Sequence, residues 1–276
     1  MLFGKERKRV ARVIRDLVVR PRSDGQMCDG DLGSGLQVLV KLAAAPLRFL
    51  PETAARMPGL LRELGERRRA IPPARRTVPN PALALGALTG GLTSDEILRP
   101  RYLNLLAASM DRATSGHVHP GFLTVLRQMT PDETRIFSRF ENDGPYPVLS
   151  IQSHPKHGGS RQTELRHFSL LGEEAGCEHP LRAPMYLDNL CRLGLTEMRP
   201  TRLSEDTRMF KPLETHAEVT RLKAEIASRP PVPAPENAGR NGNDPLVADV
   251  QYKYLFVTSF GRQFYDACEY RPEAEL

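Results

Sequence analysis

DVQYKYLFVTSFGRQFYDACE, residues 249–269, combines the two periodicities that distinguish a strand from a helix. In its first half, apolar and aromatic side chains alternate with polar ones, as in a β-strand with one buried face: Val250, Tyr252, Tyr254 and Phe256 against Asp249, Gln251 and Lys253. A hydroxyl at Thr258 or at the next residue can then cap a helix that carries Phe264 on its apolar side. This stretch therefore predicts a strand that leads directly into a helix.

Helix signals lie upstream of this strand. Thr130, Pro131 and Glu133 supply an N-cap, an N1 proline and a capping-box partner in one run. Apolar spacing predicts a second helix that ends near residue 176, with Leu165, Phe168 and Leu171 on its buried face, and a third over residues 184–193.

The segments between these helices are predicted to hold little regular structure. Residues 142–159 are loop-like, with a short strand at 148–151 at most, and a second short strand is expected at 195–198. Residues 229–245 are rich in Pro, Asn and Gly and have almost nothing to bury, so we expect a disordered insert.

Three helices followed by a two-stranded ribbon is the order of a winged helix, which we assign to about residues 131–269. The helix at 184–193 then occupies the recognition position. A plain helical domain with one hairpin is the alternative that the pattern leaves open. The predicted fold class is mainly α: an N-terminal helical region, followed by a helical, winged-helix-like C-terminal domain with a small β ribbon.

A proline-rich connector separates two regions of different character. Residues 71–81 hold four prolines and predict a linker. We therefore expect a basic and amphipathic helical region at 1–81 and a helical domain at 82–276, which includes the winged-helix-like unit.

The positive charge of the chain is concentrated in residues 1–22, where eight Lys or Arg stand against two acidic residues, although the whole chain has a net charge of only +6. Apolar residues recur there at helical spacing, which predicts a basic amphipathic helix. Such a helix can lie on anionic lipid, follow the phosphates of nucleic acid, or pack on the body of the protein. The candidates for an anionic contact are Lys5, Arg7, Lys8, Arg9, Arg12 and Arg15.

The sequence indicates a reducing compartment and no export. The four cysteines form no CxxC pair, and the N-terminus lacks the apolar run of a secretory signal. The longest apolar stretch, residues 36–50, contains Lys41, Pro46 and Arg48 and is too short to span a bilayer. We expect a cytoplasmic protein, with peripheral membrane contact through the basic segment as an open alternative.

The sequence presents no complete set of catalytic or metal-binding residues. His117 and His119, or His154 and His157, have spacings that can ligate zinc, but no four-ligand set or acidic base accompanies them. The glycines near residue 30 follow no strand, so they do not match a phosphate-binding loop. We therefore predict no metal, no cofactor and no catalytic residue.

Three segments together resemble a known family. They are LLAASMDRATSGHVHPGFLTVLRQMTPDE (residues 105–133), YLDNLCRLGL (186–195) and LFVTSFGRQFYDACE (255–269), and they are similar to blocks of the abortive-infection alpha family, a domain of unknown function. The resemblance covers roughly residues 93–269. It implies a predominantly α-helical bacterial protein that takes part in conflict with phage or other mobile elements. It implies no catalytic residues.

The polar side of the predicted recognition helix carries Asp188, Asn189 and Arg192. Asn and Arg can read base edges, but a single basic residue on this side is few for a duplex reader, and this favours a protein contact or a purely structural role. The leading hypothesis is a non-enzymatic accessory protein in phage defence that acts through a protein or an anionic surface. A winged-helix DNA-binding regulator is the alternative, and a metal-dependent hydrolase is the least favoured.

Overall fold

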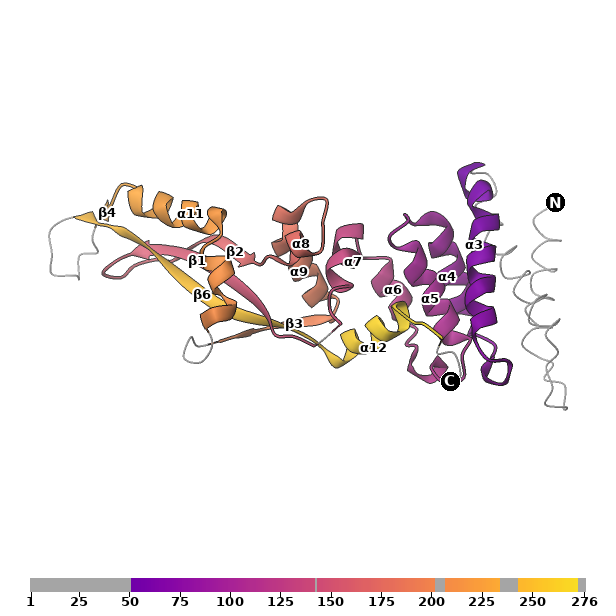
Figure 1. Cartoon of the computed structure of the whole chain (residues 1–276). Helices are drawn as coiled ribbons and strands as arrows, with labels where there is room; N and C mark the ends of the chain where they lie inside the picture. The colour runs from indigo at the N-terminus through magenta and orange to yellow at the C-terminus, as the bar shows by residue number, and fades with distance from the viewer. Residues whose placement is uncertain (1–50, 142, 202–206, 234–242, 273–276) are drawn as a thin grey trace, which may run out of the picture. The chain divides into compact units, whose positions relative to one another are not determined.

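The computed structural model describes residues 51–141, 143–201, 207–233 and 243–272 (Figure 1). The chain forms two compact units, one drawn from Met1–Gln128 and Asp266–Leu276 and the other from Met129–Tyr265. The boundary that the prolines predict near residue 81 remains a prediction, whereas the contacts divide the chain after Gln128.

The described part of the first unit is helical. Its elements are α3 (Pro51–Ala70), η1 (Pro73–Arg75), α4 (Pro81–Thr93), α5 (Arg99–Ser109), η2 (Ser115–His117) and α6 (Phe122–Leu126). Leu64, Leu88 and Leu103, from three different helices, are fully buried in its core. Helices α4 and α5 approach closely because Gly90 has no side chain, and a Cβ built there would lie 2.3 Å from the ring of Tyr102. The glycine-rich sequence of α4 thus permits the packing of this unit.

A buried carboxylate ties the C-terminal segment into the first unit. Asp111, which is fully buried, accepts hydrogen bonds from Tyr270 Oη at 2.6 Å and from Arg75. Asn104 Nδ2 also donates to the carbonyl oxygen of Cys268 at 2.8 Å. These bonds join residues that are far apart in the sequence.

The second unit is built on a four-stranded antiparallel sheet with the strand order β2-β1-β6-β3. The strands of this unit are β1 (Tyr146–Pro155), β2 (Gln162–Phe168), β3 (Thr196–Pro200), β4 (Val232–Pro233), β5 (Asn243–Asp244) and β6 (Leu246–Val257). Its helices are α7 (Pro131–Phe137), α8 (Leu171–Glu174), η3 (Pro180–Arg182), α9 (Ala183–Arg192), η4 (Thr207–Met209), α10 (Lys211–Glu214), α11 (Ala217–Ser228) and α12 (Ser259–Cys268), whose last residues belong to the first unit. Strands β4 and β5 form a separate pair.

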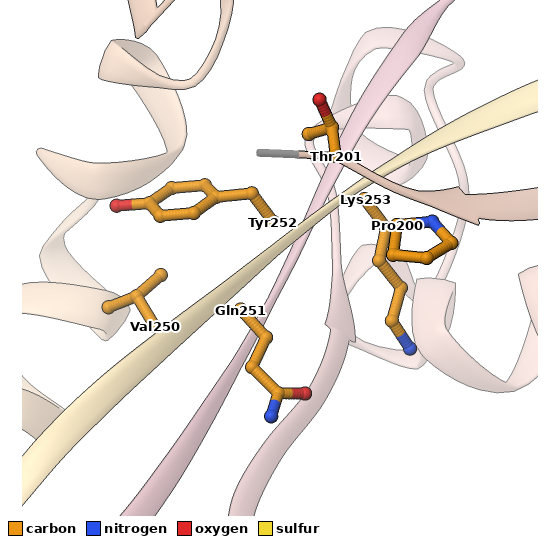
Figure 2. A pocket seen from close by; sticks show the side chains of 6 residues that line it. All are labelled: Pro200, Thr201, Val250, Gln251, Tyr252 and Lys253. Atoms are coloured by element: carbon orange, nitrogen blue, oxygen red, sulfur yellow. The ribbon is translucent and has the colours of Figure 1, made fainter. Parts of the chain in front are cut away.

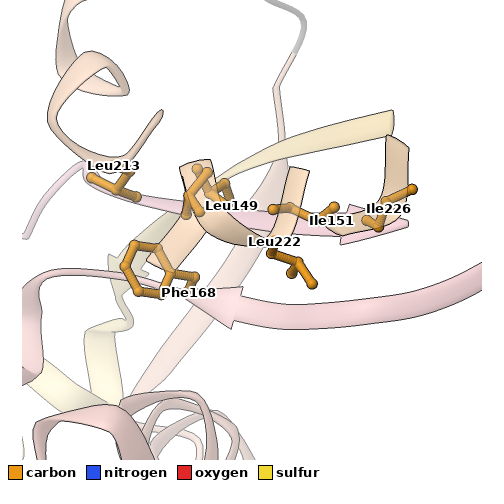
Figure 3. Close-up of a cluster of buried hydrophobic side chains, with 7 residues drawn as sticks. Leu149, Ile151, Phe168, Leu213, Leu222 and Ile226 are labelled. Atoms are coloured by element: carbon orange, nitrogen blue, oxygen red, sulfur yellow. The ribbon is translucent and has the colours of Figure 1, made fainter. Parts of the chain in front are cut away.

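Helix α11 covers one face of the sheet. Leu149, Ile151 and Phe168 of strands β1 and β2 pack against Leu222 and Ile226 of α11 in one buried cluster (Figure 3). Alternate residues of β1 point to the opposite face, where α9 lies against β2 and β3. The sheet therefore separates an apolar layer under α11 from a second layer that includes α9.

The prediction of a mainly α fold with a small ribbon is wrong. The second unit has a mixed α/β architecture, and nothing in it supports a winged helix. Residues 146–155, which were predicted to be largely loop, form β1, and β1 pairs along its whole length with β6. The polar residues of this segment hid the strand, because they alternate with apolar residues that are buried under α11.

The helix predicted around Leu165 and Phe168 is also wrong, because these residues lie in β2. The pairing of β1 with β2 shifts between Leu149, which faces Phe168, and Ile151, which faces Leu165. This bulge inserts an extra residue into β2, so that two side chains three positions apart point to the same face. A spacing of three is also typical of a helix, and the two structures share this sequence pattern.

Sequence signals within a single helix or strand predicted the structure better than the overall order of elements did. The capping box of Thr130 and Glu133 is confirmed at the start of α7, and the helix predicted over 184–193 is confirmed as α9. The strand predicted at 195–198 is confirmed as β3, which begins one residue later and extends to Pro200, and the strand predicted at 250–256 lies within β6. At the ends of the insert predicted to be disordered, β4 pairs with β5, while residues 234–242 lie outside the described residues.

Candidate functional site

A cluster of three ionisable side chains lies where α9 meets the sheet. His167 sits in the bulge of β2 with a φ of 51°, the only positive φ among the described non-glycine residues. Its backbone N–H donates to Ser150 Oγ at 3.1 Å, which holds it in this conformation. Its ring lies between Asp188 of α9, with Nδ1 2.7 Å from Oδ1, and Lys253 of β6, with Nε2 3.1 Å from Nζ. The bulge thus directs an imidazole between an acidic side chain, Asp188, and a basic side chain, Lys253.

Burial, more than the charges around it, determines the protonation of His167. Burial lowers the pKa of His167 below its ordinary value, and the ammonium of Lys253 lowers it further, although the hydrogen bond to Asp188 acts in the opposite direction. The imidazole is therefore neutral at neutral pH. Because a carboxylate can only accept, Nδ1 carries the proton toward Asp188, and Nε2 accepts a hydrogen bond from Lys253. Asp188 and His167 together hold the ammonium in place.

Lys253 also lines an open groove of about 440 Å³. The groove is lined by Pro200, Thr201, Val250, Gln251, Tyr252 and Lys253. Figure 2 shows Val250 and Tyr252 on one side of β6 and Lys253 on the other, as the alternation of a strand requires. The groove therefore follows the edge of β6 at the point where β3 ends, and Lys253 is its charged lining residue.

A second polar junction anchors α9 to α7. Asp132, in the first turn of α7, accepts hydrogen bonds from the backbone N–H groups of Glu178 and His179 and from Tyr186 Oη, at 2.9 to 3.0 Å. Burial raises the pKa of Asp132, but these bonds and one from Arg135 outweigh burial and lower the pKa to about 2. Asp132 is therefore ionised at neutral pH, and both of its carboxylate oxygens accept hydrogen bonds.

Glu133 makes the second link of this junction. Its carboxylate accepts from the backbone N–H of Thr130 at 2.6 Å, as the capping box predicts, and from Asn189 Nδ2 at 2.8 Å. The segment TPDE thus does more than start a helix, because both of its acids also bind elements that follow it by about 50 residues.

The recognition-helix candidates all make hydrogen bonds inside the second unit. Asp188 binds His167, Asn189 binds Glu133, and Arg192 donates to Asn189 Oδ1 at 2.8 Å. The structure therefore brings these three candidates together in the packing of α9. The polar side chains of this helix therefore have partners within the protein, and a contact of this helix with DNA or with another protein stays a prediction.

The other candidates are distributed as follows. Lys5, Arg7, Lys8, Arg9, Arg12 and Arg15 lie outside the described residues. His117 and His119 are exposed, and His119 Nδ1 accepts from the backbone N–H of Gly121 in the turn before α6. Over the described ranges, no group of three or more His, Cys, Asp or Glu residues could hold a metal ion.

Sequence reasoning missed His167, Lys253 and Ser150. His167 was hidden because its segment was assigned to a helix, and Lys253 was treated only as the polar partner in an alternating strand. The one signal available was a lysine in the centre of a strand with aromatic neighbours, since strands disfavour Lys in their interior. That signal does not identify a partner 86 residues away.

Residues 52–268 match the family described as abortive infection alpha. A structure titled as that of an uncharacterized protein from the hydrocarbon-degrading marine bacterium Alcanivorax borkumensis SK2 aligns with 57% of this chain and 96% of its own, at 18% identity and a TM-score of 0.33. No curated protein matches.

In the described part of the chain, no helix is both long and apolar enough to cross a membrane.

The family match extends well beyond the segments that carry the resemblance. The matched region includes α3 to α7, the whole sheet and α12, and it takes in both polar junctions of α9. Since the match spans more than half of the sequence, this chain belongs to the abortive infection alpha family.

Proposed function

We propose that this protein acts in bacterial abortive infection, as a cytoplasmic accessory protein that limits phage propagation through contacts with other macromolecules rather than through catalysis. The observation that carries this proposal is the family match over residues 52–268. Its description concerns abortive infection and specifies no reaction.

The chemistry of the polar residues supports a role in binding. Asp132, Glu133 and Asp188 are the acids at the two junctions of α9, and each is hydrogen bonded to neighbouring protein groups. The hydrogen bonds of these acids hold α9 against α7 and against the sheet. What this arrangement leaves at the surface is the groove beside Lys253, which is open and shaped by a strand edge.

The test is a phage challenge in a bacterial host. Cells that express the protein should form fewer plaques than cells with the empty vector, and infected cultures should survive at low but not at high phage multiplicity. A matched control expresses the same gene with an early stop codon, which removes the protein but keeps the transcript. Equal plaque numbers in all three strains across a broad phage panel would contradict the proposed role.

We also propose that residues 1–22 make the contact with an anionic surface, through Lys5, Arg7, Lys8, Arg9, Arg12 and Arg15. The local charge and the apolar stripe support this, and each basic residue near an anionic membrane contributes about 1 kcal/mol. Full-length protein should bind phosphatidylserine vesicles or duplex DNA more weakly at 300 mM than at 50 mM salt, and deletion of residues 1–22 should abolish binding. Unchanged binding by the truncated protein would place the contact elsewhere.

A further inference from the structure

One edge of β6 is only partly paired. Strand β1 pairs with residues 246–255 along one edge, but β3 pairs with the other edge only at residues 253–257. The backbone N–H of Thr201 adds one hydrogen bond to the carbonyl oxygen of Tyr252, at 3.1 Å. Among the described residues, the stretch 246–251 therefore has a strand neighbour on one side only.

The direction of the backbone groups follows from strand alternation. In an antiparallel sheet, the N–H and C=O of one residue point to the same side, and those of the next residue point to the other side. The C=O of Tyr252 points toward the row of β3, so those of Val250 and Ala248 face the open edge as well. This edge thus presents an N–H donor and a C=O acceptor at every second residue, which is the arrangement that accepts an added strand.

The side chains next to this edge differ on the two faces of the sheet. Ala248, Val250 and Tyr252 pack against the apolar cluster under α11, whereas Gln251 and Lys253 lie on the opposite face (Figure 2). The groove begins where β3 ends, at Pro200 and Thr201. A strand added there would continue the row of β3 and would fill the groove.

We propose that the open edge of β6, residues 246–251, binds an extended peptide segment of a partner protein as an added antiparallel strand, and that Lys253 selects a carboxylate on this segment. The inference rests on the proposed function of the protein as a contact protein and deepens it by defining the partner's chemistry. Strand addition supplies affinity through main-chain hydrogen bonds, and alternate side chains supply specificity.

Lys253 has the geometry to recognise a carboxylate. An ammonium has three donors, and one of them is directed to Nε2 of His167, so two remain for a ligand. The next acid on the same face of β6 is Asp249, which forms an ion pair with Arg161. An incoming carboxylate is therefore favoured beside Lys253 and disfavoured beside Asp249. The pattern of the segment is apolar residues facing Val250 and Ala248, with one acid opposite Gln251, the first free position on the face of Lys253, since Pro200 of β3 pairs with Lys253 itself.

The test uses the full-length protein and labelled eight-residue peptides of alternating valine and threonine. In one peptide a central threonine is replaced by glutamate, in a second by lysine, and a third is unchanged. Fluorescence anisotropy should show that the glutamate peptide binds about three- to fivefold more tightly than the unchanged peptide, as expected for a partly exposed ion pair. N-methylation of the peptide amides that face β6 should abolish binding, whereas methylation of the alternate amides should not.

Two protein variants separate the parts of the proposal. Lys253→Gln should remove the preference for glutamate and keep the binding of the unchanged peptide, while the exposed Lys156→Gln should change neither. Val250→Pro should abolish all binding, because it removes an N–H that faces the open edge but none that pairs with β1. Circular dichroism establishes that each variant is folded.

Three results would overturn the inference. They are no binding of any peptide by the wild-type protein, equal binding of the peptides methylated on either side, and a dimer that dissociates in Val250→Pro, which would assign the edge to a second copy. Phage protection without peptide binding would refute the inference alone. Peptide binding without protection would refute the proposed function and leave the edge site in place.

Discussion

At the residue scale, the environment of Asp132 predicts a pH-dependent contribution to the stability of the folded state. Its pKa is about 2, against an ordinary value of 3.8, because hydrogen bonds to its ionised form outweigh its burial. A carboxyl group with a lowered pKa stabilises the folded state fully above its ordinary pKa, and this contribution is lost as the pH falls toward its folded pKa. The shift corresponds to about 2 kcal/mol, lost between pH 4 and pH 2.

Asp132→Asn tests this assignment. An amide oxygen cannot accept all the bonds that two carboxylate oxygens accept, so the variant should be about 1–3 kcal/mol less stable at pH 6. The stability of its second unit should also fall less steeply between pH 4 and pH 2. Urea unfolding at pH 6, pH 4 and pH 2 measures both changes in stability, with Glu141→Gln as an exposed control in the same unit. A variant with the wild-type pH dependence would show that another group titrates.

At the scale of elements, the start of α12 depends on the absence of a side chain at Gly261. A Cβ at this position would lie 2.0 Å from the carbonyl oxygen of Leu195, just before β3. Thr258 fixes this approach, because its backbone N–H donates to the same oxygen at 3.0 Å and its hydroxyl donates to the carbonyl oxygen of Gly194 at 2.6 Å. A backbone oxygen held in this way cannot rotate away.

Gly261→Ala should therefore destabilise the second unit by at least about 2 kcal/mol, although alanine is the better helix former by about 1 kcal/mol. Gly65→Ala, in the middle of α3, is the matched control, since nothing lies within 4 Å of a Cβ built there. That substitution should increase stability by up to about 1 kcal/mol. Thermal and urea unfolding measure both changes, and two substitutions with the same sign would contradict this explanation.

The same elements show what the sequence can predict. The start of α7 was predictable because the cap of Thr130 and its partner Glu133 lie within one helical turn. Strand β2 was not, because its bulge gives Leu165 and Phe168 the spacing of a helix. The cluster at His167 depends on both this bulge and the pairing of β1 with β6, so no local pattern contains it. Interactions within one turn were readable, and those that need a sheet register were not.

At the scale of the whole molecule, the division into two units predicts two centres of stability. Leu103 is fully buried in the first unit and Ile226 in the second. Leu103→Ala and Ile226→Ala should each cost about 2–5 kcal/mol. Hydrogen exchange with mass spectrometry should show faster exchange in α4 and α5 for the first variant, and in β1 and α11 for the second. Faster exchange over the whole chain in both variants would indicate a single cooperative unit.

The central pairing of the sheet also affects how the protein is made. Strands β1 and β2 are neighbours in sequence and can form a hairpin as soon as both have left the ribosome. Tyr146 and Leu255, however, are paired across about 110 residues, so β1 has to wait for β6. At ordinary translation rates, this delay lasts roughly 5 to 20 seconds. Until residues 217–228 have also left the ribosome, α11 is not there to cover the apolar face of the hairpin, and an apolar surface exposed in this way is prone to aggregation.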